Sequence, residues 1–209
     1  NRVKDVTVKL LDEKANPIKD AEVEITMEDH LFNYGTSVNQ FYVTETTKED
    51  VGNGYTVSEN ISRFKSTLKE YFNTAVPENA YKWALWAGRK QNSDMCATVL
   101  KEMGLRMRGH VLWWDAIDFA PKGSDGKPAE VTDEDVKNHI SELAEAYKGR
   151  TAEWDVLNEP VKSRGIFLKD TEYGSEAIIK DWFDTARRAD PNAILYVNET
   201  NITGEDGDN

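Results

Sequence analysis

The sequence predicts an α/β protein with a parallel β-sheet, both from the order of its segments and from the residues that follow them. Segments with the composition of buried strands alternate with amphipathic helical segments along the 209 residues, up to a fifth strand. Such alternation is typical of right-handed strand–helix–strand crossovers and therefore of a parallel sheet. Polar and aromatic residues follow several of these strands, where parallel sheets place functional groups. Two architectures fit: a doubly wound sheet of five strands, or five strands of an eight-stranded barrel, which usually takes ~250 residues.

Residues 1–28 are expected to form a β-hairpin-like prelude. Apolar and polar residues alternate over 3–10 and again over 21–27, and the sequence ANPIKD at 15–20 supplies a turn between them. Alternation with a period of two residues favours half-buried strands, and the turn would join them. We expect this prelude to pack on the domain that follows it.

The remaining strands and helices are expected from apolar runs and from helical periodicity, respectively. The strands are predicted at 30–39, 72–76, 105–114, 153–158 and 193–198. Apolar residues three and four positions apart predict the helices between them. The four apolar sets are Ile61, Phe64, Leu68 and Tyr71; Met95, Val99, Leu100 and Met103; Val136, Ile140, Leu143 and Tyr147; and Ile178, Ile179, Trp182, Phe183 and Ala186.

Capping residues and helix breakers mark the ends of these helices. Ser58 is expected to cap the first helix, and Thr132 the third, whose first turn is crowded with acidic residues. Gly104 suits the position just after the second helix, where a left-handed backbone is common. Gly149 closes the third helix, and Pro191 stops the fourth.

Charge and cysteine content exclude several classes of function. The formal net charge of −12 disfavours nucleic acid or an anionic membrane as the main partner, because their phosphate groups would be repelled. The single cysteine, Cys96, excludes an internal disulfide and a thiolate metal cluster, and its apolar helical surroundings predict a small core residue. No stretch approaches the ~20 apolar residues of a membrane span, and no signal peptide is visible at Asn1. A cytoplasmic protein and a trimmed secreted protein would both have such a sequence.

Carboxylates, amides, a lysine, a histidine and a tryptophan collect at the ends of the predicted strands. They are Glu78, Asn79 and Lys82 with the second strand, His110 and Trp114 with the third, Asn158 and Glu159 with the fourth, and Asn198 and Glu199 with the fifth. Because parallel strands end at one rim, these groups should converge. Acids and amides hydrogen-bond to vicinal hydroxyls, and aromatic rings stack on sugar rings, so the set suits a ligand rich in hydroxyl groups.

The sequence lacks the signatures of common cofactor and metal sites. There is no glycine-rich phosphate loop, no HExxH motif and no Ser-His-Asp set of local signatures. With three histidines in the whole chain, a histidine-rich metal site is disfavoured. We therefore expect neither a cofactor nor a metal ion.

Three motifs on successive predicted strands carry a family resemblance. FNTAVPENAYKW, RGHVLWW and WDVLNEP, in this order, resemble the family 10 glycoside hydrolases, which are retaining endo-β-1,4-xylanases, and the prelude also resembles the lead-in of several members. The resemblance implies a (β/α)8 TIM barrel of which about the first five strands are present. It assigns 29–202 to part of the catalytic domain and 203–209 to a polar tail. It further implies xylan or xylo-oligosaccharides as substrate and a secreted or extracellular location.

The resemblance also implies site residues. Glu159 matches the general acid/base, and Asn158 matches the residue that holds the 2-hydroxyl of the sugar, a contact that tightens as the transition state forms. A glycosidic oxygen leaves poorly unless it is protonated, which is the physical reason for an acid at this position. The other implied substrate-binding residues are Glu78, Asn79 and Lys82 for the glycone xylose units, and His110 and Trp114 around the subsite of bond cleavage.

The chain departs from the family pattern at two places. After Trp114 the family often shows His-x-Gln, where this chain has Asp115, Ala116 and Ile117. The family nucleophile lies on the seventh strand, so no nucleophile is expected within this chain. Glu199 lies in the context of the fifth strand of the family and is not taken as its replacement.

Three functions are weighed against one another. The first is a xylanase that needs a missing C-terminal segment for its nucleophile, so that the isolated chain would be inactive and would associate through exposed strand edges. The second is a non-catalytic protein that binds xylan or xylo-oligosaccharides. The third is an unrelated five-stranded α/β protein. Strand order separates the third from the others, because constant winding indicates a barrel and a reversal indicates a doubly wound sheet.

Overall fold

The structure is a computed structural model that describes residues 7–26, 31–161, 165–168 and 176–200. The chain divides into two compact units, Asn1–Phe32 and Asn33–Asn209. The polar tail predicted at 203–209 lies outside the described residues.

The described residues of the first unit, 7–26 and 31–32, contain a turn and no paired strands. Residues 3–6 and 27 of the two strands that the sequence predicts lie outside the described residues. Within 7–26 the only pairing is an isolated antiparallel bridge between Leu11 and Pro17. The Asp12 side chain accepts hydrogen bonds from the backbone N–H groups of Lys14 (2.9 Å) and Asn16 (2.8 Å), and these close the turn. A two-stranded hairpin is marginally stable without a third strand or a packed face, which explains why the alternation alone forms no ladder.

The second unit is built on one parallel sheet whose strands follow the chain order. The strands are β1 Gly35–Val38, β2 Thr74–Pro77, β3 Arg106–Trp114, β4 Glu153–Asn158 and β5 Ile194–Asn198. Each strand pairs in parallel with the next, so the order in the sheet is β1-β2-β3-β4-β5. The winding never reverses, which excludes the doubly wound alternative and confirms five strands of a barrel.

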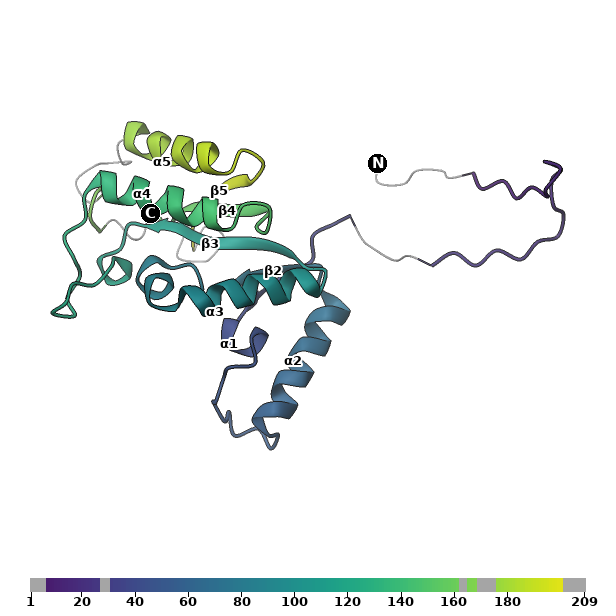
Figure 1. Cartoon of the computed structure of the whole chain (residues 1–209), viewed down its shortest axis with the longest axis horizontal. Coiled ribbons are helices and arrows are strands. Elements are labelled where there is room, and N and C mark those ends of the chain that lie inside the picture. Colours follow the sequence, from purple (N-terminus) through teal and green to yellow (C-terminus); the bar gives the residue numbers. More distant parts are fainter. Residues whose placement is uncertain (1–6, 27–30, 162–164, 169–175, 201–209) are drawn as a thin grey trace. The chain divides into compact units, whose positions relative to one another are not determined.

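Helices follow the strands and cover them. They are α1 Gln40–Val43, α2 Val57–Tyr71, α3 Trp83–Glu102, the 3₁₀ turn η1 Ile117–Phe119, α4 Asp133–Ala146 and α5 Glu176–Ala189. The longer helices confirm the predicted periodic segments, whereas α1 and η1 were not predicted. Both α3 and α4 pack against β3, α5 packs against β4 and β5, and α4 lies along α5 (Figure 1). No helix among the described residues is long and apolar enough to cross a membrane.

Local hydrogen bonds fix the helix ends. Thr132 caps α4 as predicted, since Asp135 N–H donates to its hydroxyl and the Asp135 carboxylate accepts from Thr132 N–H. The prediction that Ser58 caps α2 is wrong: the cap is Thr56, which forms the same reciprocal pair with Glu59. A Thr-x-x-Glu sequence satisfies two backbone donors at once, whereas Ser58 lies inside the first turn. Gly104 has φ +77°, which confirms its place after α3.

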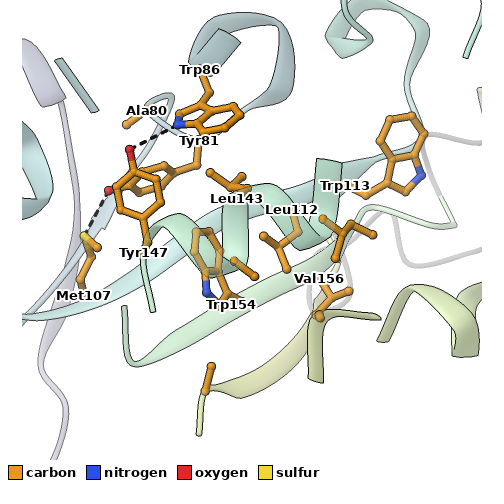
Figure 2. Packing of buried hydrophobic residues seen from close by; sticks show 14 of the residues in the cluster. Ala80, Tyr81, Trp86, Met107, Leu112, Trp113, Leu143, Tyr147, Trp154 and Val156 are labelled. Carbon is orange, nitrogen blue, oxygen red and sulfur yellow. Dashed lines mark hydrogen bonds between the residues drawn. The ribbon is translucent and has the colours of Figure 1, made fainter. Parts of the chain in front are cut away.

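Aromatic residues form the core between β3, β4 and their helices (Figure 2). The ring of Trp154 on β4 lies over Gly109 on β3, where a Cβ atom would come within 2.1 Å of the indole. Tyr147 accepts a hydrogen bond from Trp86 Nε1 (3.2 Å) and packs edge-on against Tyr81. Glycine is therefore required at position 109 so that the Trp154 indole can lie against the backbone of β3.

Two further core residues are titratable groups without charge. Cys96 is fully buried, as predicted, and burial raises the pKa of its thiol to about 12. His139 on α4 is 3% exposed and stacks on Trp83, with the ring centroids 4.2 Å apart. Neither ring nitrogen of His139 has a hydrogen-bond partner among the described residues. Burial, assisted by the nearby Lys90 ammonium, lowers the pKa of His139 to about 3.

The buried His139 predicts a loss of stability in mild acid. Between pH 6.5 and about 3 the unfolded chain binds a proton at His139 that the folded chain does not bind, so stability falls as the pH falls. From pH 6.5 to pH 5 this group alone removes about 2 kcal/mol. We expect the free energy of unfolding of His139→Phe, which keeps a ring against Trp83, to decrease by about 2 kcal/mol less than that of the wild type over this interval. Urea unfolding of both proteins at the two pH values measures the difference, and parallel pH dependences would contradict the assignment.

Candidate active site

The predicted site residues lie at or beside the carboxyl ends of β2, β3 and β4, except His110, which lies in the middle of β3 and below that rim. Trp114 is the last residue of β3, and it pairs in register with Asn158, the last residue of β4, which pairs with Asn198 on β5. Glu78 follows β2 directly, and its backbone N–H donates to the carbonyl of Val38 (3.0 Å). The strand ends therefore form one rim, as parallel pairing requires.

Two bulges align this rim. Between His110 and Trp113 on β3 there is one residue more than between Asp155 and Leu157 on the partner strand β4. A second shift of the same kind lies on β4: one residue separates Asp155 from Leu157, whereas their partners on β5, Tyr196 and Val197, are consecutive. Bulges bend a strand and change the direction of the side chains that follow. Here they precede the rim residues on both strands.

The backbone at Glu159 explains how Asn158 and Glu159 can both belong to the rim. Consecutive strand residues normally point to opposite faces of a sheet. Glu159 has φ +49°, a conformation that is uncommon for a residue with a side chain and that interrupts the alternation. Its N–H donates to the carbonyl of Asn198 (2.7 Å), and the Asn198 amide donates to the Asn158 side-chain oxygen (2.6 Å). The Asn158 amide therefore turns its NH₂ group away from Asn198.

A lysine connects the residues after β2 with an aromatic pair formed by the last residue of β3 and the last residue of η1. Lys82 Nζ donates to the side-chain oxygen of Asn79 (2.8 Å) and lies 5.2 Å from the ring centroids of both Trp114 and Phe119. Trp114 and Phe119 are stacked, with centroids 4.0 Å apart and planes 8° from parallel. Burial lowers the pKa of Lys82, while the carboxylates of Glu78 and Glu159 act in the opposite direction.

Alternate residues of β3 and β4 form a set of ion pairs below the rim. Arg106 Nε donates to the Glu153 carboxylate (2.9 Å), and Arg108 Nε donates to Asp155 Oδ1 (3.0 Å). The other oxygen of Asp155 lies 2.9 Å from His110 Nδ1. Since a carboxylate that receives a guanidinium acts as an acceptor, Nδ1 is the nitrogen of His110 that carries the hydrogen. His110 is thereby held by Asp155, and in the neutral ring its other nitrogen, Nε2, is an acceptor.

The sequence reasoning missed several residues that shape this region. Phe119 is one, although an aromatic residue five positions after Trp114 gave a local signal. Asp155 and Arg108 are two others. The sequence shows charged residues at alternate positions of both strands, but it does not show which arginine pairs with which carboxylate. Within the described part of the chain, no three His, Cys, Asp or Glu side chains are grouped so that they could hold a metal ion.

The fold and the rim define a class of protein. A parallel sheet wound in constant order, with carboxylates, amides and aromatics at the carboxyl ends of its strands, is part of a (β/α)8 barrel. The chain belongs to glycosyl hydrolase family 10, which matches residues 31–208. The resemblance found in the sequence motifs is thus confirmed.

The alignments with individual relatives differ in how much of this chain and of each relative they include. Anti-sigma-I factor RsgI6 of Acetivibrio thermocellus is 27% identical over 99% of this chain and 25% of that protein. Endo-1,4-beta-xylanase C of Phanerodontia chrysosporium is 32% identical over 63% of this chain and 35% of that enzyme. A solved GH10 endoxylanase retrieved from a sugarcane soil metagenome superposes with a TM-score of 0.60 at 24% identity, over 82% of this chain and 49% of that chain. The chain therefore spans about half of this solved structure and less of the curated relatives.

The ion pair below the rim makes a prediction about stability. Arg108→Leu leaves the Asp155 carboxylate, whose side chain is 3% exposed, without its guanidinium. We expect a loss of about 3–5 kcal/mol, the usual cost of removing one partner from a buried pair. The double variant Arg108→Leu/Asp155→Leu should lose less than the sum of its single variants. Urea unfolding of the wild type, the two single variants and the double variant measures this double-mutant cycle.

The control is the exposed pair between Lys180 and Asp184 on α5. Lys180→Leu should leave stability nearly unchanged, because solvent screens such a pair. Similar losses for Arg108→Leu and Lys180→Leu would contradict the buried character of the first pair.

Proposed function

We propose that this chain supplies the acid/base and glycone-binding side of a retaining endo-β-1,4-xylanase site. The observation that carries the proposal is the position of Glu159 and Asn158 at the end of β4, level with Trp114 on β3 and next to Asn198 on β5. The printed names of several relatives, including the enzymes from Phanerodontia chrysosporium, support xylan as the substrate class. Xylan is a polymer too large to enter a cell, so we also propose that the protein acts outside the cell.

In this proposal Glu159 is the general acid/base. It donates its proton to the glycosidic oxygen as the bond breaks, and it later removes a proton from the water that attacks the glycosyl–enzyme intermediate. Asn158, whose oxygen is occupied by Asn198, offers its NH₂ group to the sugar 2-hydroxyl. That contact strengthens as positive charge develops on the sugar ring, and it therefore lowers the barrier rather than only binding the substrate.

The other rim residues bind the sugar units on the glycone side. Glu78 and Asn79 have acceptors for sugar hydroxyls, and Lys82 is a donor already oriented by Asn79. Trp114 offers an aromatic surface at the subsite of cleavage. His110, held through Nδ1 by Asp155, offers Nε2 as an acceptor for a hydroxyl hydrogen.

Retention requires a second carboxylate about 5–5.5 Å from the acid/base. Glu199 is a poor candidate, because its two oxygens accept hydrogen bonds from the backbone N–H groups of Val161 and Thr200, both at 2.8 Å. We therefore propose that the nucleophile comes from a polypeptide segment that carries the sixth to eighth strands of the barrel.

The acid role predicts a dependence on the leaving group. In an active protein that includes this chain, Glu159→Gln should lower kcat/KM for xylan by about 10²–10⁴-fold. It should leave kcat/KM for 2,4-dinitrophenyl β-xylobioside nearly unchanged, because the acidic phenol departs without a proton and kcat/KM reports the glycosylation step. Steady-state kinetics on both substrates measures this. Equal losses on the two substrates would exclude Glu159 as the acid.

Two controls belong to this measurement. Glu102→Gln changes an exposed carboxylate at the end of α3 and should have no effect on either substrate. Since the proposed mechanism uses two carboxylates and no metal ion, a chelator should leave wild-type hydrolysis unchanged. Loss of activity that added metal restores would contradict this mechanism.

A second candidate is a non-catalytic protein that binds xylo-oligosaccharides. The observation that favours it is that a relative aligned over 99% of the chain carries the name of a regulatory factor, an anti-sigma-I factor, and not that of an enzyme. Such a protein would use the same rim residues for binding and would lack the nucleophile.

The 209-residue chain on its own tests for binding. We expect calorimetry to detect xylohexaose binding that Lys82→Ala weakens by about tenfold, the equivalent of one charge-assisted hydrogen bond. Reducing-sugar assays should detect no turnover. Turnover by this chain at ordinary enzyme rates of about 1–10³ s⁻¹ would show that the nucleophile is within it. Turnover by a longer protein that contains the chain would favour the first candidate over the second.

A further inference from the structure

Asp115 is a fully buried carboxylate that follows Trp114, at the position where the family pattern has histidine. It accepts hydrogen bonds from three consecutive backbone N–H groups of the β4–α5 loop. These come from Ile166 (3.2 Å), Phe167 (3.1 and 3.2 Å to the two oxygens) and Leu168 (2.9 Å). One side chain at the end of β3 therefore holds a segment more than fifty positions away in the sequence.

The two backbones also touch directly. Gly165 N–H donates to the carbonyl of Asp115 (2.7 Å), and a Cβ atom at Gly165 would lie 2.5 Å from that oxygen and 3.0 Å from Ala116 Cα. Glycine thus allows an approach that any other residue would block. The same loop segment also packs on the core, because the ring of Phe167 lies edge-on against Trp113 with the centroids 6.2 Å apart.

The loop held in this way is the loop that begins with Glu159. Its first residues are fixed from β5, because Val161 N–H donates to Glu199. Residues 165–168 are fixed from β3 by Asp115. Two described parts of this loop, Val161 and residues 165–168, are therefore each held by a residue that directly follows a strand flanking β4. One of these residues, Asp115, directly adjoins Trp114.

We propose that Asp115 is a positioning residue for Glu159: by fixing residues 165–168, six positions after Glu159, against the end of β3, it sets the reach of the Glu159 carboxyl toward a glycosidic oxygen beside Trp114. This inference rests on the acid/base role proposed for Glu159. Displacement of a catalytic group by about 1 Å can cost 10²-fold in rate, so an anchor behind the acid matters more than its contribution to stability suggests.

Asp115→Asn tests the anchor with almost no change in shape. The carboxamide keeps one acceptor oxygen and turns an NH₂ group toward the backbone N–H groups that Asp115 now receives. The matched control is Asp190→Asn. Asp190 is 2% exposed and accepts a backbone hydrogen bond from Asn192 (3.2 Å), but it lies between α5 and β5, at the opposite end of the strands.

In an active protein that includes this chain, Asp115→Asn should lower kcat/KM for xylan by about tenfold or more. The loss for 2,4-dinitrophenyl β-xylobioside should stay within about twofold, because that leaving group needs no acid. Asp190→Asn should change neither value. A purely structural role would lower the amount of folded enzyme and would reduce both rates equally, and that result would overturn the proposal.

Amide hydrogen exchange separates failure of this inference from failure of the proposed function. In the 209-residue chain, Asp115→Asn should speed exchange at Phe167 and Leu168, and Asp190→Asn should not. Unchanged exchange in Asp115→Asn would overturn the anchor itself. Faster exchange in Asp115→Asn, together with no turnover on xylan by an otherwise wild-type protein that includes this chain, would keep the anchor and reject the xylanase function, and with it the positioning of an acid.

Discussion

The parallel register of β3, β4 and β5 is the constraint on which the candidate site depends. It places Trp114, Asn158 and Asn198 opposite one another, and a slip of one residue would separate them by about 3.3 Å along the strands. Contacts on both faces of the sheet hold that register. Ion pairs join β3 to β4 on one face, and Trp154 covers Gly109 on the other. The rim therefore takes its geometry from residues earlier on the same strands.

The ion pairs contribute geometry more than net stability. Bringing charged groups out of water costs several kcal/mol for each ion, and a well-made pair does little more than offset that cost. What the pairs provide is direction, because a guanidinium and a carboxylate fit each other in few orientations. Asp155 receives Arg108 on one oxygen and faces His110 with the other, so the tautomer of His110 is fixed from within the sheet. The same logic applies to Asp115, whose carboxylate specifies where the β4–α5 loop lies.

The sequence predicted those features that depend on local pattern. Strand and helix positions followed from apolar runs and breakers, and Glu159 was found because a short strand ends beside it. The cap at Thr56 was also a local signal and was overlooked in favour of Ser58. By contrast, the contact of Asp115 with residues 165–168 depends on packing between distant segments, and no local pattern reports it. The prelude is a related case, because alternation alone does not determine whether residues 7–26 form a paired ladder, and the structure shows only the Leu11–Pro17 bridge there.

The distribution of tryptophans gives the chain its own optical reporter. Trp86, Trp113, Trp154 and Trp182 are at most 3% exposed, so their indoles sense the protein interior. Trp83 is stacked on the buried ring of His139. Of the six indoles only Trp114 is both partly open to solvent and part of the rim. A ligand that reaches the rim would change its emission above a constant background from the others, so binding can be followed by intrinsic fluorescence without a label.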